Sequence, residues 1–200
     1  MIQIRFAKKE NLDEVLELEN KIWPPGTIAP REKFESRLKI FAKGFILAYK
    51  DGSLIGASTS QIINYDRSTI NSWENITDNG WIRNHNPKGN ALYVVSIGSI
   101  SRSGGGSALV QAQKNLAKQL SLRFLVLGSR IPGYDAYCRE QEEINIEEYV
   151  KLLRGNGELL DPELRFYKRN GLSLQGIKPN YMEDDKESRN YGAIMLWASD

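Results

Sequence analysis

The chain has 200 residues, of which 40% are hydrophobic and 26% charged, and its formal net charge is +2 at pH 7. These proportions are typical of an ordinary globular protein, and the length favours one long domain over two short ones. The nearly balanced charge argues against a nucleic acid such as DNA as the main partner, because proteins that bind such polyanions usually carry a clustered basic stripe.

The cysteine content and the apolar runs bear on the compartment. The only cysteine, Cys138, cannot form an internal disulfide, so nothing indicates an oxidising compartment. No run approaches the ~18 apolar residues that a membrane-spanning helix needs, and the N-terminus lacks the apolar stretch of a signal peptide. We therefore expect a cytoplasmic protein without a membrane partner.

The first 63 residues predict a strand, two helices and a hairpin. Alternating polar and apolar residues over 3–7 predict the strand. Asn11 is expected to cap a helix that ends at Trp23-Pro24-Pro25-Gly26, because proline cannot continue a helix, and 32–41 predicts a second, amphipathic helix. Asp51-Gly52 is a strong turn signal, and it joins predicted strands over 44–49 and 54–63.

The middle of the chain begins with a long surface excursion over 64–90, which we expect Trp73 and Trp81 to order. The dense apolar run over 91–100 predicts the central strand. A glycine turn, a helix over 107–120 and a buried strand over 122–127 follow. This order resembles a β-α-β unit and predicts that the two strands lie side by side in parallel.

The last third begins with a second excursion, 132–161, which is rich in charge and predicts one helix over 146–153. Asp161-Pro162 starts a further helix, which Asn170-Gly171 ends. Residues 172–177 and 193–197 predict the closing strands. We expect a single domain over 1–200 with insertions near 64–90 and 132–161.

The glycine turn is the first candidate site. Gly104, Gly105 and Gly106 stand between a buried strand and a helix, so a ligand can approach the backbone closely. The helix that follows presents unpaired N–H groups and the positive end of its dipole, which together favour a phosphate or diphosphate. Arg102 adds a charge, and Ser103 and Ser107 add hydroxyls. A P-loop or a dinucleotide-binding loop is excluded, because neither glycine pattern is complete.

The turn resembles the signature of the GNAT acetyltransferase family, Gln/Arg-x-x-Gly-x-Gly/Ala. The chain reads Ser101-x-x-Gly104-x-Gly106 and continues Ser-Ala-Leu-Val, with serine where the family has Gln or Arg. Phe166-Tyr167-Lys168-Arg169-Asn170-Gly171-Leu172 resembles a second family motif, Phe-Tyr-x-x-x-Gly-Phe. The phrases over 128–134 and 160–164 are also similar to acetyltransferase modules that are fused to carbon–nitrogen hydrolases.

This resemblance implies an α/β (α+β) fold with a mixed, mostly antiparallel sheet and a splayed pair of parallel strands. It also implies acetyl-CoA as co-substrate, with its diphosphate on residues 101–107 and its pantetheine arm beside Ile97, Gly98 and Ser99. An amine attacks the thioester directly, and a backbone N–H of the central strand stabilises the oxyanion. Tyr167 matches the tyrosine that protonates the leaving thiolate, and a phenol of pKa ~10 holds its proton at pH 7.

Other residues were weighed as members of the site. The central strand carries no acid; Glu17, Glu19 and Asp135 are conceivable bases, but each is expected to be a solvated charge, so we assign no base. Arg130 and Tyr134 follow a strand end and are candidates for substrate contact, with a structural turn as an equal alternative. Trp23 is a candidate wall of the acceptor pocket. No metal site is expected, because His and Cys do not cluster.

The sequence therefore predicts an acetyl-CoA-dependent N-acetyltransferase that acts on an amine of a small molecule or peptide, with a homodimer as a further possibility. A non-catalytic acyl-CoA-binding or regulatory module is the alternative, which Ser101 and the missing strand acid support. A scaffold that binds a nucleotide or peptide through the glycine turn is a third hypothesis. Nothing in the sequence names the acceptor.

Overall fold

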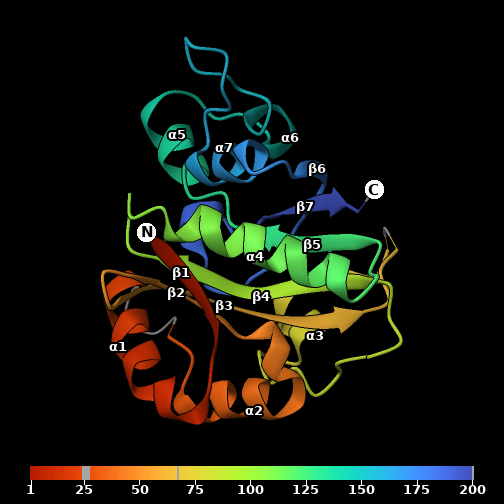
Figure 1. The fold of residues 1–200 in the computed structure, drawn as a ribbon. Coiled ribbons are helices and arrows are strands. Elements are labelled where there is room, and N and C mark those ends of the chain that lie inside the picture. The colour runs from red at the N-terminus through yellow and green to blue at the C-terminus, as the bar shows by residue number, and fades with distance from the viewer. Residues whose placement is uncertain (24–27, 67, 200) are drawn as a thin grey trace.

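The computed structural model describes residues 1–23, 28–66 and 68–199. Its described part forms one seven-stranded sheet in the order β1-β2-β3-β4-β5-β7-β6 (Figure 1). The strands are β1 (Ile2–Phe6), β2 (Ile46–Lys50), β3 (Ser53–Ile63), β4 (Ala91–Ser99), β5 (Phe124–Ser129), β6 (Ser173–Lys178) and β7 (Gly192–Ala198). Only β4 and β5 are parallel neighbours in this sheet; every other pair is antiparallel. This confirms the mixed, mostly antiparallel sheet with one parallel pair.

Helices cover both faces of the sheet. They are α1 (Leu12–Ile22), α2 (Arg31–Phe41), α3 (Trp73–Thr77), α4 (Gly105–Gln119), α5 (Tyr134–Glu140), α6 (Ile146–Tyr149) and α7 (Pro162–Arg169), with 3-10 turns η1 (Lys9–Asn11), η2 (Ala42–Gly44) and η3 (Lys186–Ser188). Figure 1 shows α4 across one face, α1 and α2 against the β1–β4 half, and α5, α6 and α7 beyond β5. No helix in the described ranges has both the length and the apolar character that crossing a bilayer requires.

The side chains of β2 alternate between two hydrophobic cores, one on each face of the sheet. Ile46 and Ala48 pack into the core beneath α4, while Leu47 and Tyr49 pack on the other side, beneath α1 and α2. Successive side chains of a strand point to opposite faces, so a strand buried on both faces reads as a continuous apolar run. Each leucine or isoleucine so buried contributes ~1.5–3 kcal/mol through the hydrophobic effect.

Most predicted elements are present, and the local signals explain them. Asp51 and Gly52 both have positive φ, 51° and 82°, as the tight turn between β2 and β3 requires. Asp161 caps α7, because its Oδ1 accepts hydrogen bonds from the N–H groups of Glu163 at 2.9 Å and Leu164 at 3.1 Å. Gly171, at φ 75°, ends that helix as expected.

Two local predictions differ from the structure. Asn11 precedes α1 but does not cap it; its Oδ1 accepts from the Lys8 N–H at 2.8 Å instead. The helix expected over 146–153 stops at Tyr149, because Leu153 turns back to pair with Leu159. Helices α3 and α5 lie where the sequence predicts none. Helix α1 does end at Ile22, whereas Pro24-Pro25-Gly26 lie outside the described residues.

Trp73 anchors the first excursion through its side chain, whereas the contact at Trp81 is made by its backbone carbonyl. The Trp73 indole donates to the Val95 carbonyl of β4 at 2.8 Å, which fixes α3 beneath the sheet. The Trp81 carbonyl accepts from Ser36 Oγ of α2 at 2.8 Å. Both contacts bind the excursion to elements far away in the sequence.

Substitution of Gly128 tests the packing between β5 and the loop before β7. A Cβ at Gly128 would lie 1.9 Å from the ring of Tyr181, which is 1% exposed and bonded through its hydroxyl to Tyr93. We expect Gly128→Ala to lower the free energy of unfolding by ~1–3 kcal/mol, because overpacking forces buried groups apart. Urea denaturation measures the change. Gly176→Ala is the control, since no atom lies within 4 Å of its Cβ position, and equal stability of the two variants would contradict the packing.

Candidate functional site

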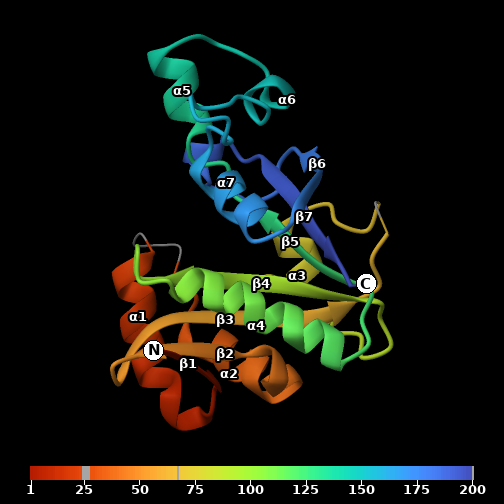
Figure 2. The same ribbon diagram turned by 45° about the horizontal axis from the view of Figure 1, so that its top comes forward.

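The pairing of β4 with β5 stops early. Ala91, Leu92 and Tyr93 pair with Phe124, Leu125 and Val126, whereas β4 continues to Ser99 and β5 to Ser129. Figure 2 shows the two strands starting side by side near the C-terminus and then diverging. The exposure of β4 changes at nearly the same point, because residues 91–95 are buried and 96–99 are half-buried. The free edge of β4 over 94–99 therefore borders an opening in the sheet.

An irregularity in β4 lies where this opening begins. Thr59 of β3 pairs with Ser96 and Ser60 pairs with Val94, so Val95 is an extra residue in β4. Such a bulge locally disrupts the ladder and leaves the extra residue unpaired within it. The Val95 carbonyl is held by Trp73, which fixes the bulge from below.

The glycine turn closes one end of the opening. Arg102 has φ 57° and Gly104 φ 83°, so the chain turns sharply after β4 and enters α4 at Gly105. The N-cap residue of α4 is Gly104, which has no side chain to cap the helix. Ser103 Oγ accepts a hydrogen bond from the Gly105 N–H at 3.1 Å. The other N–H groups of the first turn, together with the helix dipole, give this end of α4 the character that favours an anion.

Gly106 sits in a narrow place between this turn and α7. A Cβ there would lie 3.1 Å from the Phe166 ring and 3.2 Å from Ser99 Oγ. Three predicted cofactor residues, Ser99, Gly105 and Gly106, are therefore close together beside α7. The turn residues Ser101, Arg102, Gly104 and Ser107 are exposed, whereas Ser103 is half-buried.

Tyr167 lies in the core on the α4 side of the sheet. It is 5% exposed and contacts Phe166 edge to face, with ring centroids 5.1 Å apart. Burial, with a smaller contribution from the charge of Glu163, raises the pKa of Tyr167 well above its ordinary value. The phenol is therefore protonated at neutral pH and suits a proton donor. None of the hydrogen bonds between described residues involves its hydroxyl.

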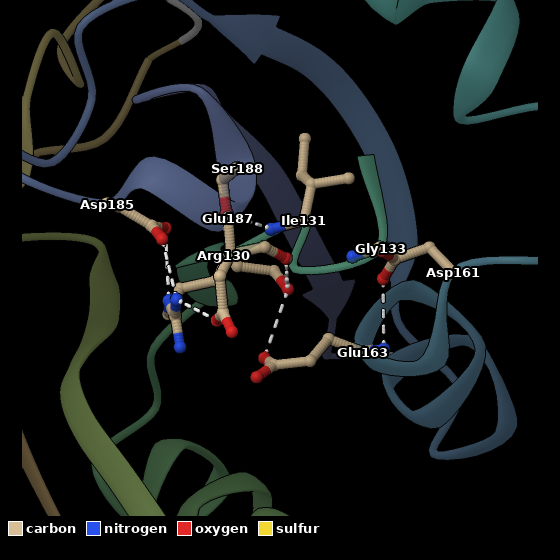
Figure 3. A network of polar contacts seen from close by, with 9 residues as sticks. Arg130, Ile131, Gly133, Asp161, Glu163, Asp185, Glu187 and Ser188 are labelled. Carbon is tan, nitrogen blue, oxygen red and sulfur yellow. Dashed lines mark hydrogen bonds and ion pairs between the residues drawn. The ribbon is translucent and has the colours of Figure 1, made fainter. Parts of the chain in front are cut away.

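Arg130 joins the end of β5 to the loop before β7 (Figure 3). Its guanidinium donates to Asp185 Oδ1 at 2.6 Å and Oδ2 at 3.0 Å, and to Glu187 Oε2 at 2.6 Å. Ile131 N–H donates to Ser188 Oγ at 2.8 Å. The charge of Arg130 is thus engaged by two carboxylates, and these contacts fix the loop against β5.

Glu163 lies one helical turn before Tyr167 and faces the same strand end. Its carboxylate is 3.5 Å from Ser129 Oγ (Figure 3). Burial raises the pKa of Glu163 to about 7, against the opposing effect of the Arg130 charge. The wall formed by β5 and α7 therefore carries a carboxyl group that titrates near neutrality.

Tyr134 and Trp23 occupy different surroundings. Tyr134 is 4% exposed in α5, where it packs against Tyr149 and Tyr191 and donates to the Ile144 carbonyl at 2.9 Å. Trp23 lies at the opening, because a Cβ on Gly98 would be 3.2 Å from its Nε1. The structure thus places Trp23, but not Tyr134, beside the predicted cofactor segment of β4.

Sequence reasoning missed a buried polar pair on the α1 side of β4. Glu19 is 5% exposed and Arg37 2% exposed, so the expectation that Glu19 is a solvated charge is wrong. Glu19 follows Val15 by four residues and precedes Trp23 by four, which places it on the apolar stripe of α1. That position was the available signal. Within the described ranges, no three His, Cys, Asp or Glu side chains are grouped to hold a metal ion.

Comparison with known proteins identifies the family. No family model matches the chain. It is 34% identical over 98% of its length to "Uncharacterized N-acetyltransferase YkwB" of Bacillus subtilis, and the match covers 88% of that protein. It is also 34% identical, over 97% of its length, to "Probable hydrolase YhcX" of Bacillus subtilis, but spans only 38% of that longer protein.

The fold gives the same result. GphF, a GNAT-like decarboxylase in complex with isobutyryl-CoA, superposes with a TM-score of 0.84 at 24% identity, covering 98% of both chains. An identity this low supports the fold only. Together with the similarity to YkwB across nearly the whole chain, it shows that this protein is an enzyme of the GNAT N-acetyltransferase family.

Proposed function

We propose that the enzyme transfers the acetyl group of acetyl-CoA to an amine of a small molecule or peptide by direct attack. The observation that carries this proposal is the opening between β4 and β5 beside the N-terminus of α4. An extended thioester arm fits the free edge of β4, where backbone groups can bond it as they would a neighbouring strand. In this arrangement Ile97, Gly98 and Ser99 contact the arm.

The glycine turn suits the diphosphate of CoA. First-turn N–H groups of α4 provide donors, Arg102 provides an exposed charge, and the absence of Cβ atoms at 104–106 allows close approach. The complex of GphF with isobutyryl-CoA shows that a protein of this fold takes an acyl-CoA. For this enzyme the acyl group and the acceptor are part of the proposal.

Tyr167 and the bulge in β4 suit the two charges that develop in the reaction, on the leaving sulfur and on the carbonyl oxygen. The protonated phenol of Tyr167 gives a proton to the departing thiolate. An N–H group freed from the ladder at Val95 stabilises the oxyanion that forms on the carbonyl. In this proposal the thioester lies between the two groups, so that one stabilises the charge on oxygen and the other protonates the sulfur.

Turnover separates this function from the alternatives. Purified enzyme with acetyl-CoA and a panel of primary amines and peptides is expected to release free thiol and acetylated amine. Binding of CoA without turnover on any amine would instead support an acyl-CoA-binding module. Displacement of CoA by equimolar ATP would favour a nucleotide-binding scaffold.

Gly104→Ala tests the glycine turn itself. Gly104 has φ 83°, a conformation that strains any residue with a Cβ, so the substitution shifts the first amides of α4. We expect the Kd for acetyl-CoA to rise about tenfold or more, which is ~1.4 kcal/mol, as measured by isothermal titration calorimetry. Gly157→Ala is a matched control, because Gly157 has φ 79° and no atom within 4 Å of its Cβ position. An unchanged Kd for Gly104→Ala would contradict the assignment of the turn.

A further inference from the structure

The buried pair Glu19 and Arg37 has an unusual division of contacts. Arg37 Nε donates to the Gly80 carbonyl at 2.8 Å, and its Nη1 lies 3.2 Å from Thr59 Oγ1 and 3.3 Å from Ser96 Oγ. No salt bridge between described residues involves Glu19, although the two charges are close enough to influence each other. Arg37 therefore donates its hydrogen bonds to β3, β4 and the first excursion rather than to the Glu19 carboxylate. A pair that served only to join α1 to α2 would be expected to bond directly.

Two neighbours of Glu19 lie beside the open part of β4. Trp23, which directly follows α1 and comes four residues after Glu19, hydrogen bonds to it, and the same indole borders Gly98. Arg37, its charged neighbour, reaches Ser96. Ser96, Gly98 and Trp23 are all half-buried, so Glu19 is separated by one side chain from an accessible stretch of β4. This is the face of β4 opposite α4, away from the proposed diphosphate site.

The charged groups near Glu19 in the described part of the chain are cations, but none of them bonds to its carboxylate directly. Burial raises the pKa of Glu19 to about 7, while the Arg37 charge and the Trp23 hydrogen bond oppose this rise. In α2, Lys33 also lies near Arg37, and burial lowers the pKa of Lys33. Strands β3 and β4 contribute only one ionisable side chain, Tyr93, whose hydroxyl is bonded to Tyr181. An ionised Glu19 thus forms no salt bridge with another described residue and is offset only at a distance by Arg37, so an ammonium group could pair with it directly.

We propose that the acceptor binds as an ammonium ion against Glu19 and that Glu19 is the base of the reaction. This inference rests on the proposed function. The ammonium gives one proton to the carboxylate, which passes it to solvent. The nitrogen lone pair then forms the C–N bond, and the carbonyl oxygen becomes the oxyanion. As the carbonyl re-forms, the C–S bond breaks and the sulfur takes the proton of Tyr167. The second proton, lost from the nitrogen as it becomes an amide, restores the phenol.

Glu19→Gln tests the base with Glu17→Gln as control. Glutamine keeps an oxygen for the Trp23 hydrogen bond but cannot take the proton, whereas Glu17 lies exposed on the same helix. We expect Glu19→Gln to lower kcat/KM for a primary alkylamine about 100-fold at pH 7, with the Kd for acetyl-CoA unchanged. Wild type and Glu17→Gln should reach a plateau above pH ~7. Glu19→Gln should instead keep rising about tenfold per pH unit toward the pKa of the amine, ~10.

The outcomes distinguish this inference from the proposed function. If wild type acetylates amines and Glu19→Gln keeps its rate and pH profile, Glu19 is not the base, while the proposed function stands. If wild type acetylates nothing in the panel, the proposed function fails, and the Trp23 indole N–H signal in NMR decides on the amine site. An alkylamine that shifts this signal in wild type but not in Glu19→Gln supports an ammonium site at Glu19. The absence of any shift in wild type overturns it.

Discussion

Tyr167→Phe is expected to reduce kcat about 100-fold while the Kd for acetyl-CoA stays within a factor of two. General acid catalysis by one side chain contributes ~10²–10⁴-fold, and the phenol of Tyr167 is protonated at neutral pH because burial raises its pKa. Stability should change little, since none of the hydrogen bonds between described residues uses this hydroxyl. Steady-state thiol release and calorimetry measure the two quantities.

Tyr137→Phe is the control for this change. Tyr137 is a half-buried tyrosine of α5 that packs against Tyr149, so the substitution removes a hydroxyl from the second excursion rather than from α7. It should leave kcat unchanged. If Tyr167→Phe transfers acetyl groups at the wild-type rate, the leaving thiolate obtains its proton elsewhere. Equal losses in both variants would indicate a general effect on folding.

Arg37→Met is expected to be among the most destabilising single changes, at about 3 kcal/mol. It leaves the Gly80 carbonyl and the Thr59 and Ser96 hydroxyls without the guanidinium that binds them, and a buried group that loses its partner costs ~1–3 kcal/mol. Urea denaturation measures the effect. A loss below 1 kcal/mol would show that these contacts are dispensable.

The cost of Arg37→Met should depend on pH through Glu19. The pKa of Glu19 is raised from 4.5 to about 7 in the folded protein, so its contribution to stability is present below 4.5 and is lost as pH rises to about 7. The Arg37 charge lowers this pKa, so removing it should extend the loss to higher pH. Arg37→Met is therefore expected to cost more at pH 8 than at pH 5. The excess should vanish in the double variant Arg37→Met/Glu19→Gln.

The fold was predictable where local chemistry decides it. Asp51-Gly52 specifies a turn with two positive φ angles, and Asn170-Gly171 specifies a helix end, whatever the rest of the chain does. The parallel pair of β4 and β5 followed from the helix between them. The limits of α6 did not follow, because the pairing of Leu153 with Leu159 overrides the helical spacing.

The candidate site was predictable only in part. The glycine turn and Tyr167 stand in motifs, so their spacing along the chain identifies them. Glu19 does not stand in a motif. Its surroundings depend on Arg37, eighteen positions later in the chain, and on β3 and β4. Likewise Asp185 engages Arg130 from 55 positions away, and no local pattern indicates that a polar loop will return to that strand end.

The two sides of the opening are held by forces that respond to different conditions. The loop before β7 is attached through Arg130, and through Arg189 to Asp135 and Glu143. Glu187 and Glu143 are 64% and 68% exposed, and salt screens such pairs strongly, whereas Asp185, at 2%, is protected. The β4 side rests instead on buried apolar contacts and on Arg37. Rising ionic strength should therefore loosen only the outer part of the β5 side, so the width of the opening at that end depends on the salt concentration, while the β4 side keeps its shape.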